Sequence, residues 1–177
     1  KFIKANELFK ERNYPESEKI LKIILDENPN PLKSNYLISD LYFRKAQYDK
    51  ALKHVKKCLS IDAYDSDANF IAGNIYKALN SLYDAKEAYG WASRSTKYKS
   101  AALSQISEIY LIEKKYSDAI SYAKESLNYN RLNINALEIL SISNRILKNN
   151  SESKKWIDNI LFLDPVSYTH IRYHETG

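Results

Sequence analysis

A chain of 177 residues with 44% hydrophobic and 28% charged residues can form a packed core, which excludes a disordered tail. Three glycines and four prolines are too few for an all-β protein, which needs a turn signal about every dozen residues. The net charge of +5 is dispersed among 22 acidic residues, so the sequence does not predict the concentrated basic face of a nucleic-acid-binding protein.

The cysteine content and the pattern of apolar residues narrow the class of protein further. Cys58 is the only cysteine, which excludes an internal disulfide and a cysteine cluster around a metal. No apolar run reaches the roughly 20 residues of a membrane helix, and no signal peptide is evident, so we expect no membrane partner and slightly favour the cytoplasm. Because the chain lacks methionine, we expect it to be a fragment without its N-terminus.

The sequence repeats itself with a period of 34 residues. The phrase YDKALKHVKKCLSID at Tyr48 returns as YSDAISYAKESLNYN at Tyr116, two periods later. Small residues recurring in register indicate a close approach of two backbones in every repeat. Two columns contain only small residues: Ala5, Ser39, Gly73, Ser107 and Ser141 form one, and Ser17, Ala51, Ala85, Ala119 and Ser153 form the other.

Each row of this period predicts two helices joined by a short turn. In row two, Ile38, Leu41 and Tyr42 recur at helical spacing, and a second helical stripe follows a break near Ala46 and Gln47. Prolines at 15, 29, 31 and 165 suit helix starts or ends. The predicted repeats are 1–31, 32–65, 66–99, 100–133 and 134–167, and 168–177 begin a truncated sixth repeat or a capping helix.

Several pairs of residues carry a family resemblance. A small residue precedes a tyrosine by three positions, a Tyr-x-x-Ala phrase begins the second helix, and Asp-Pro closes the repeat. The pairs are Gly73 with Tyr76, Tyr48 with Ala51, Tyr116 with Ala119, and Asp164 with Pro165. In these features the chain resembles the tetratricopeptide repeat family, over residues 1 to about 167. The resemblance implies an all-α, right-handed superhelical solenoid whose first helices line a concave groove.

An open, extended groove suits a bound peptide or protein segment and poorly suits chemistry that needs a closed pocket. We therefore expect a non-enzymatic interaction scaffold, with no catalytic residues, metal or cofactor, and with self-association through open solenoid ends as a further interaction. The groove positions implied by the resemblance are Lys33, Tyr36, Leu37, Asp40, Phe43, Arg44, Phe70, Ile71, Asn74, Lys77, Gln105 and Glu108.

The competing interpretation of the groove side chains is packing. Leu37, Phe43 and Phe70 could instead fill the contact with the next repeat. Some members of the family bind a terminal carboxylate through lysine and asparagine, but Asp40 and Glu108 would repel such a group. A largely apolar ligand of mixed polarity fits these positions better.

Two chemical alternatives are weaker. His170 and His174 have the i, i+4 spacing of a zinc pair, but no third ligand is evident, and exposed histidines are the favoured interpretation. Cys58 lies in a core column and is interpreted as structural.

A second resemblance concerns the wider context. The phrases AYGWASRSTKYKSAA and LDPVSYTHIRY are similar to the repeat region of large bacterial proteins in which a β-sandwich similar to carbohydrate-active enzymes comes first. The alternative function is therefore an accessory repeat region of a larger carbohydrate-active bacterial protein.

Overall fold

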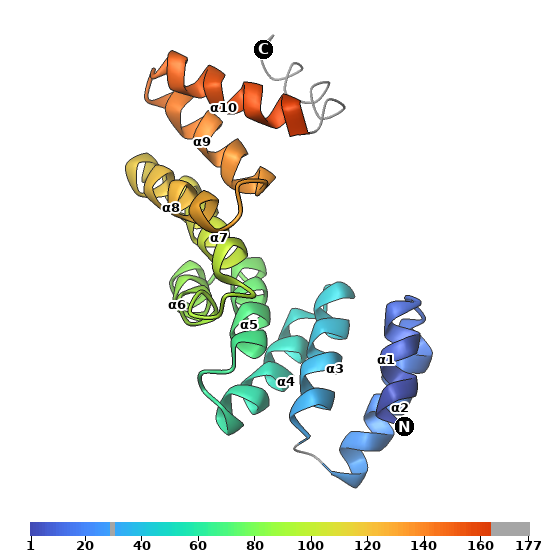
Figure 1. Cartoon of the computed structure of the whole chain (residues 1–177). Helices are drawn as coiled ribbons and strands as arrows, with labels where there is room; N and C mark the ends of the chain where they lie inside the picture. Colours follow the sequence, from blue (N-terminus) through green and yellow to red (C-terminus); the bar gives the residue numbers. More distant parts are fainter. Residues whose placement is uncertain (29–30, 164–177) are drawn as a thin grey trace. The chain divides into compact units, whose positions relative to one another are not determined.

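The computed structural model describes residues 1–28 and 31–163, and this part of the chain forms ten α-helices and no strand (Figure 1). Contacts divide the chain after α6 into a first unit, residues 1–92, and a second unit that begins at Ser93. The first unit contains α1 (Phe2–Lys10), α2 (Tyr14–Glu27), α3 (Leu32–Arg44), α4 (Tyr48–Ile61), α5 (Ser66–Ala78) and α6 (Leu82–Ala92). The second contains α7 (Lys99–Ile112), α8 (Tyr116–Tyr129), α9 (Ile134–Ile146) and α10 (Asn150–Leu163).

The turn inside each helix pair recurs with the sequence period. In the part of the chain that the structure describes, five non-glycine residues have positive φ, between 54° and 61°. In each turn the next residue donates its N–H to the carbonyl five positions earlier, at 2.8 Å. This bond satisfies a carbonyl that the end of the first helix would otherwise leave unpaired. The five residues are Arg12, Ala46, Asn80, Lys114 and Lys148.

Ala46 is the least suited of these five to a left-handed backbone, because its Cβ crowds the following carbonyl and it has no polar group to compensate. We expect Ala46→Gly to stabilise the protein by about 0.5–1 kcal/mol. Ala78→Gly, at an exposed site at the end of α5, is the control and should destabilise it. Urea unfolding followed by circular dichroism measures both changes, and an unchanged or lowered midpoint for Ala46→Gly would contradict the turn geometry.

The two small-residue columns face each other within the helix pairs. In four of the five pairs a buried serine hydroxyl donates to the backbone carbonyl twelve residues away, on the other helix. Such a bond requires the helices to approach closely, which only small side chains at the crossing allow. The bonds run from Ser17 to Ala5 (2.8 Å), Ser39 to Ala51 (2.9 Å), Ser107 to Ala119 (2.6 Å) and Ser153 to Ser141 (2.9 Å).

The third pair is built differently. Gly73 and Ala85 carry no hydroxyl, and the fully buried ring of Tyr89 lies against Gly73 instead. A Cβ on Gly73 would lie 2.6 Å from two carbons of that ring. The Tyr89 hydroxyl donates to Asn74 Oδ1 at 2.7 Å. Glycine at position 73 is therefore required by a close side-chain approach, because its helical backbone has no positive φ.

A polar cluster joins α2 to the end of α3. Glu18 accepts hydrogen bonds from Lys22 (2.8 Å), Lys45 (2.6 Å) and the Tyr42 hydroxyl (3.1 Å). Burial opposes the charged form of Glu18, but these three donors outweigh it and lower its pKa to about 2. The cluster therefore holds the second helix pair against the first while Glu18 is ionised.

Within the first unit the first helices of successive pairs lie in contact. α3 packs against both α1 and α5, and one apolar core runs through all six helices. In the second unit α7 contacts α9 in the same way. A row of first helices is the arrangement that the groove prediction requires. No helix in residues 1–28 or 31–163 is long and apolar enough to span a membrane.

Candidate functional site

A cavity of about 310 Å³ opens between α1, α3 and α5 in the first unit. Its walls are mainly apolar, and its charged side chains are Lys33, Asp65 and Asp67. The remaining lining residues are Phe2, Asn6, Leu32, Tyr36, Leu37, Cys58 and Ala68.

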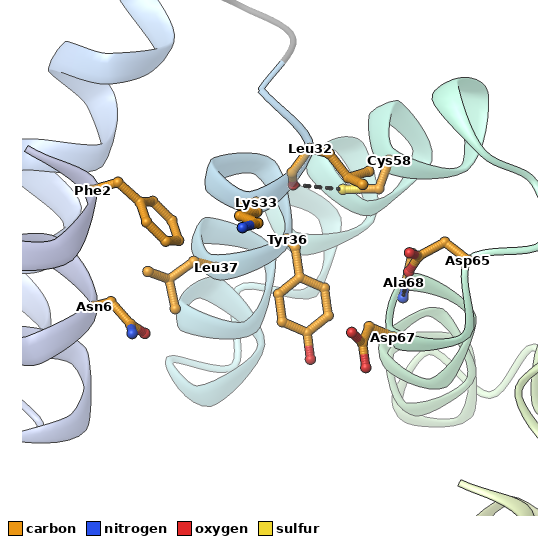
Figure 2. A pocket seen from close by; sticks show the side chains of 10 residues that line it. All are labelled: Phe2, Asn6, Leu32, Lys33, Tyr36, Leu37, Cys58, Asp65, Asp67 and Ala68. Atoms are coloured by element: carbon orange, nitrogen blue, oxygen red, sulfur yellow. Dashed lines mark hydrogen bonds between the residues drawn. The ribbon is translucent and has the colours of Figure 1, made fainter. Parts of the chain in front are cut away.

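The cavity has two sides, and α3 supplies the residues between them (Figure 2). Leu37 points toward α1, where Phe2 and Asn6 lie. Tyr36 points into the space between α3 and α5, with Asp67 opposite its ring. Because successive residues of a helix are about 100° apart around its axis, the neighbouring side chains of Tyr36 and Leu37 point toward different sides of the same cavity.

The two carboxylates of the lining have different roles. Asp65 is the N-cap of α5, and its Oδ1 accepts the Ala68 N–H at 2.7 Å. Such a bond stabilises the helix start by about 1 kcal/mol. Asp67 lies in the first turn of α5, where a negative charge is also favourable. Asp65 is therefore committed to the fold, and Asp67 is the carboxylate that can be altered without removing the cap.

Cys58 forms part of the cavity wall without offering a nucleophile. Its thiol donates to the Leu32 carbonyl at 3.5 Å. Burial, reinforced by the charge of Asp65, raises the pKa of the Cys58 thiol to about 11. The thiol therefore stays protonated near neutral pH, and Cys58 acts through packing and this hydrogen bond.

The structure places the predicted residues of row two at different depths. Lys33 is exposed and Tyr36 is half-buried, and both line the cavity. Asp40 is bound to Arg44 at 3.1 Å, and the Arg44 guanidinium also lies 5.1 Å from the centre of the Phe9 ring. Burial raises the pKa of Asp40, while Arg44 opposes this shift.

Leu37 and Phe43 contribute to packing. Leu37 is buried, although it also lines the cavity. Phe43 packs against the core of the first unit, and its ring centre is 5.8 Å from that of Tyr48. The packing interpretation that competed with the groove interpretation is therefore supported for Phe43.

The predicted residues of row three lie on α5 but outside the cavity lining. Ile71 is a core residue with 5% exposure. Phe70 is half-buried and meets the Tyr89 ring edge-on at 5.7 Å, and Asn74 accepts the Tyr89 hydroxyl. These contacts show that Phe70 and Asn74 support a buried tyrosine. Lys77 lies half-buried in the last turn of α5.

Gln105 and Glu108 belong to the second unit, where both are half-buried on α7. Burial, together with the charge of Glu108, raises the pKa of Glu138 on α9. The second unit has its own cavity of about 410 Å³, but none of the predicted groove residues lines it.

Sequence reasoning missed Phe2, Asn6 and Asp67 as lining residues, although the repeat period contains the signal. Phe2 is one period before Tyr36, and Asp67 is one period after Lys33. Carrying the row-two columns into rows one and three would have found both. Asn6 likewise stands one period before Asp40.

The zinc alternative falls outside the described residues, since His170 and His174 lie there together with the predicted helix end at Asp164 and Pro165. Within residues 1–28 and 31–163, no three side chains of histidine, cysteine, aspartate or glutamate are grouped so as to hold a metal ion.

Comparison with known proteins agrees with this architecture. A family model described as a tetratricopeptide repeat matches residues 32–65, which contain α3 and α4. A crystal structure of MamA is similar with a TM-score of 0.83 at 14% identity, covering 93% of this chain and 96% of that chain. The chain has a tetratricopeptide-repeat fold. The all-α repeat fold predicted from the sequence is thereby confirmed.

Two further proteins that are similar to this chain differ in kind. A crystal structure of YrrB, described as a tetratricopeptide-repeat protein with an unusual peptide-binding site, has a TM-score of 0.79 at 14% identity and covers 98% of this chain and 90% of that chain. A UDP-N-acetylglucosamine–peptide N-acetylglucosaminyltransferase of Caenorhabditis elegans is 28% identical over 81 residues, or 46% of this chain. The chain spans only 7% of the length of that enzyme.

Proposed function

We propose that this chain, with its tetratricopeptide-repeat fold, is a non-enzymatic interaction module that binds a peptide or protein segment along the first helices of its first unit. The observation that carries the proposal is the cavity between α1, α3 and α5, which Lys33, Tyr36 and Leu37 line. Its lining is mainly apolar and includes a few charged groups, which is the composition of a recognition surface.

The geometry favours binding over catalysis for a physical reason. The cavity is open to solvent, and the Cys58 thiol in its wall is held protonated. A reaction needs an activated group in a site from which water is excluded. A segment laid along three helices needs only shape, apolar contact and a few polar groups. YrrB, which has the same fold, is described as having a peptide-binding site, and this supports the proposal by analogy alone.

The proposal is tested by selecting short peptides from a random display library on the full chain and measuring their affinity by fluorescence anisotropy. Tyr36→Ala should weaken binding of the selected peptides about tenfold, because it removes the aromatic side chain that α3 contributes to the cavity lining. The control is Tyr83→Ala, which removes an equal side chain from a site on α6 that is 76% exposed and outside the cavity.

Circular dichroism of both variants shows whether their helix content is retained. The proposal fails if the library yields no binder, or if the two tyrosine variants bind the selected peptides as well as the unaltered chain does. The alternative, an accessory region of a larger carbohydrate-active protein, stays a prediction.

A further inference from the structure

We infer that the second unit has a binding site of its own, which takes a segment that carries an apolar side chain close to an acidic side chain. The site is the cavity of about 410 Å³ that residues of α8, α9 and α10 form with the turn between α8 and α9. A volume of this size is within the range of ligand pockets. The inference goes beyond the function proposed for the first unit, because it concerns different residues and an anionic partner.

The walls of this cavity are largely apolar, and one of them departs from the repeat pattern. Phe162 is 87% exposed. The equivalent positions of the other four repeats hold only polar residues, which are Asp26, Ser60, Arg94 and Asn128. Packing within a helix pair therefore does not require an aromatic ring here, and exposed apolar side chains gathered at one cavity favour contact with a partner. The other apolar lining residues are Leu127, Leu132, Leu137, Trp156 and Leu163.

Hydrogen bonds hold the turn that carries Arg131 and Leu132. Asn130 Oδ1 accepts the Leu132 N–H at 3.0 Å, and the Asn130 carbonyl accepts the Asn133 N–H at 3.1 Å. Asn133 is in turn the N-cap of α9, where its Oδ1 accepts the Ala136 N–H at 3.2 Å. Leu132 is nevertheless 63% exposed. A turn that is already fixed loses little conformational freedom when a partner binds to it.

Arg131 determines the charge of the cavity. Of the described residues that line it, Arg131 alone is charged, and no ion pair between described residues involves Arg131. Asn128 and Asn159 add side-chain amides, which can donate hydrogen bonds. A carboxylate suits this lining, because a guanidinium can bind both of its oxygens. The cavity of the first unit differs, since Asp65 and Asp67 belong to its lining.

The neighbouring acidic residues of α10 are paired or lie outside the lining. Glu152 is paired with Lys155 at 3.7 Å, and the Lys155 ammonium also lies 4.8 Å from the centre of the Trp156 ring. Asp158 is exposed and is not a lining residue, so water screens its charge. These residues therefore leave a carboxylate as the favoured charged group of a bound segment.

The test uses the full chain in a Trp91→Phe background, in which the lining residue Trp156 is the only tryptophan. Short peptides in a glycine–serine background, with acetylated and amidated ends, carry phenylalanine together with glutamate, glutamine or lysine at varied spacings. We expect the glutamate set to change the Trp156 emission at the lowest concentration, and to lose affinity as salt is raised.

Arg131→Gln is expected to weaken binding of the glutamate peptides about threefold to tenfold and to leave the glutamine peptides unchanged. The matched control is Arg145→Gln, which makes the same change at an exposed site on α9 outside the cavity. Phe162→Ala should weaken binding of both sets about tenfold, because it removes an apolar wall. Its control is Tyr83→Ala, which removes a highly exposed aromatic ring from the first unit.

Equal binding of the glutamate and glutamine sets, or equal effects of Arg131→Gln and Arg145→Gln, would contradict the acidic partner. If no set changes the Trp156 emission, the site itself is wrong. Three results would assign the cavity to another occupant and overturn the inference: binding that requires a free terminal carboxylate, tighter binding by a peptide of residues 164–177, or a dimer in sedimentation that Phe162→Ala abolishes. Tyr36→Ala tests the first unit separately, so either proposal can fail alone.

Discussion

Replacing Gly73 with alanine is expected to destabilise the first unit by about 1–3 kcal/mol, the cost of overpacking a close-packed core. The new Cβ would meet the Tyr89 ring at 2.6 Å, and that ring is fully buried and cannot move aside cheaply. Gly90→Ala, in the same unit, is the control. A Cβ there meets nothing within 4 Å, so this change should stabilise α6 by about 0.5–1 kcal/mol through helix propensity.

The same contact predicts a rescue. In the second repeat, Val55 occupies the position equivalent to Tyr89, and Ser39 occupies the position equivalent to Gly73. The smaller valine leaves room for the Ser39 side chain where the two helices cross. Tyr89→Val alone should destabilise by about 2–4 kcal/mol, because it leaves a cavity and removes the hydrogen bond to Asn74. Combined with Gly73→Ala, it should cost at least about 1 kcal/mol less than the two single changes together.

Tryptophan fluorescence can follow the first unit alone. The chain has two tryptophans, and a Trp156→Phe background leaves only Trp91, whose ring centre is 4.7 Å from that of Tyr64 in the first unit. Urea unfolding in this background gives the free energies of unfolding of the variants. The packing described for this crossing would be contradicted if the effects of Gly73→Ala and Tyr89→Val on the free energy of unfolding were strictly additive. It would also be contradicted if alanine at position 73 and alanine at position 90 had equal effects.

Acid is expected to destabilise the first unit by about 1–3 kcal/mol through His54 alone. Burial, together with the nearby charges of Lys57 and Lys53, lowers the pKa of His54 to about 4 from an ordinary value of 6.5. The neutral ring donates Nδ1–H to Oδ1 of the fully buried Asn35 at 2.9 Å and stacks on Tyr42 at 5.7 Å.

The direction of this effect is fixed by proton binding. Between pH 6.5 and 4 the unfolded chain protonates His54 and the folded chain does not, so the free energy of unfolding falls as the pH falls through this window. His54→Gln keeps a side-chain donor for Asn35 but cannot titrate. Its urea midpoint should therefore vary less with pH between 6.5 and 4.5 than that of the unaltered chain.

Glu18 acts in a different window and serves as an internal check. Its pKa is lowered from 4.5 to about 2, so its stabilising effect is lost only below pH 4.5. If His54→Gln and the unaltered chain lose stability equally between pH 6.5 and 4.5, the imidazole is not the group responsible.

The sequence predicted the repeat, the helix pairs and the small-residue crossings because these depend on interactions that recur at fixed spacing. The break predicted near Ala46 and Gln47 coincides with the left-handed turn at Ala46, and the two small columns meet each other through serine–carbonyl bonds. A period of 34 residues preserves helix length and turn geometry whatever the other side chains are.

The candidate site was only partly accessible to the same reasoning. Lys33, Tyr36 and Leu37 line a cavity, but Ile71, one period after Leu37, is core, and Phe70, one period after Tyr36, packs on Tyr89. Equivalent positions have equivalent places on their helices, yet their exposure depends on the size of the side chains in the adjoining repeats.

By itself, then, the sequence determined the all-α repeat architecture, because periodic small and large residues specify how one helix crosses the next. Only the tertiary structure decided which of the periodic positions are open, since Phe2 and Asp67 come from different helices and reach the same cavity through packing between successive pairs. It also decided why Gly73 stands in a column of serines and alanine: a tyrosine sixteen residues away occupies the space that a side chain would need.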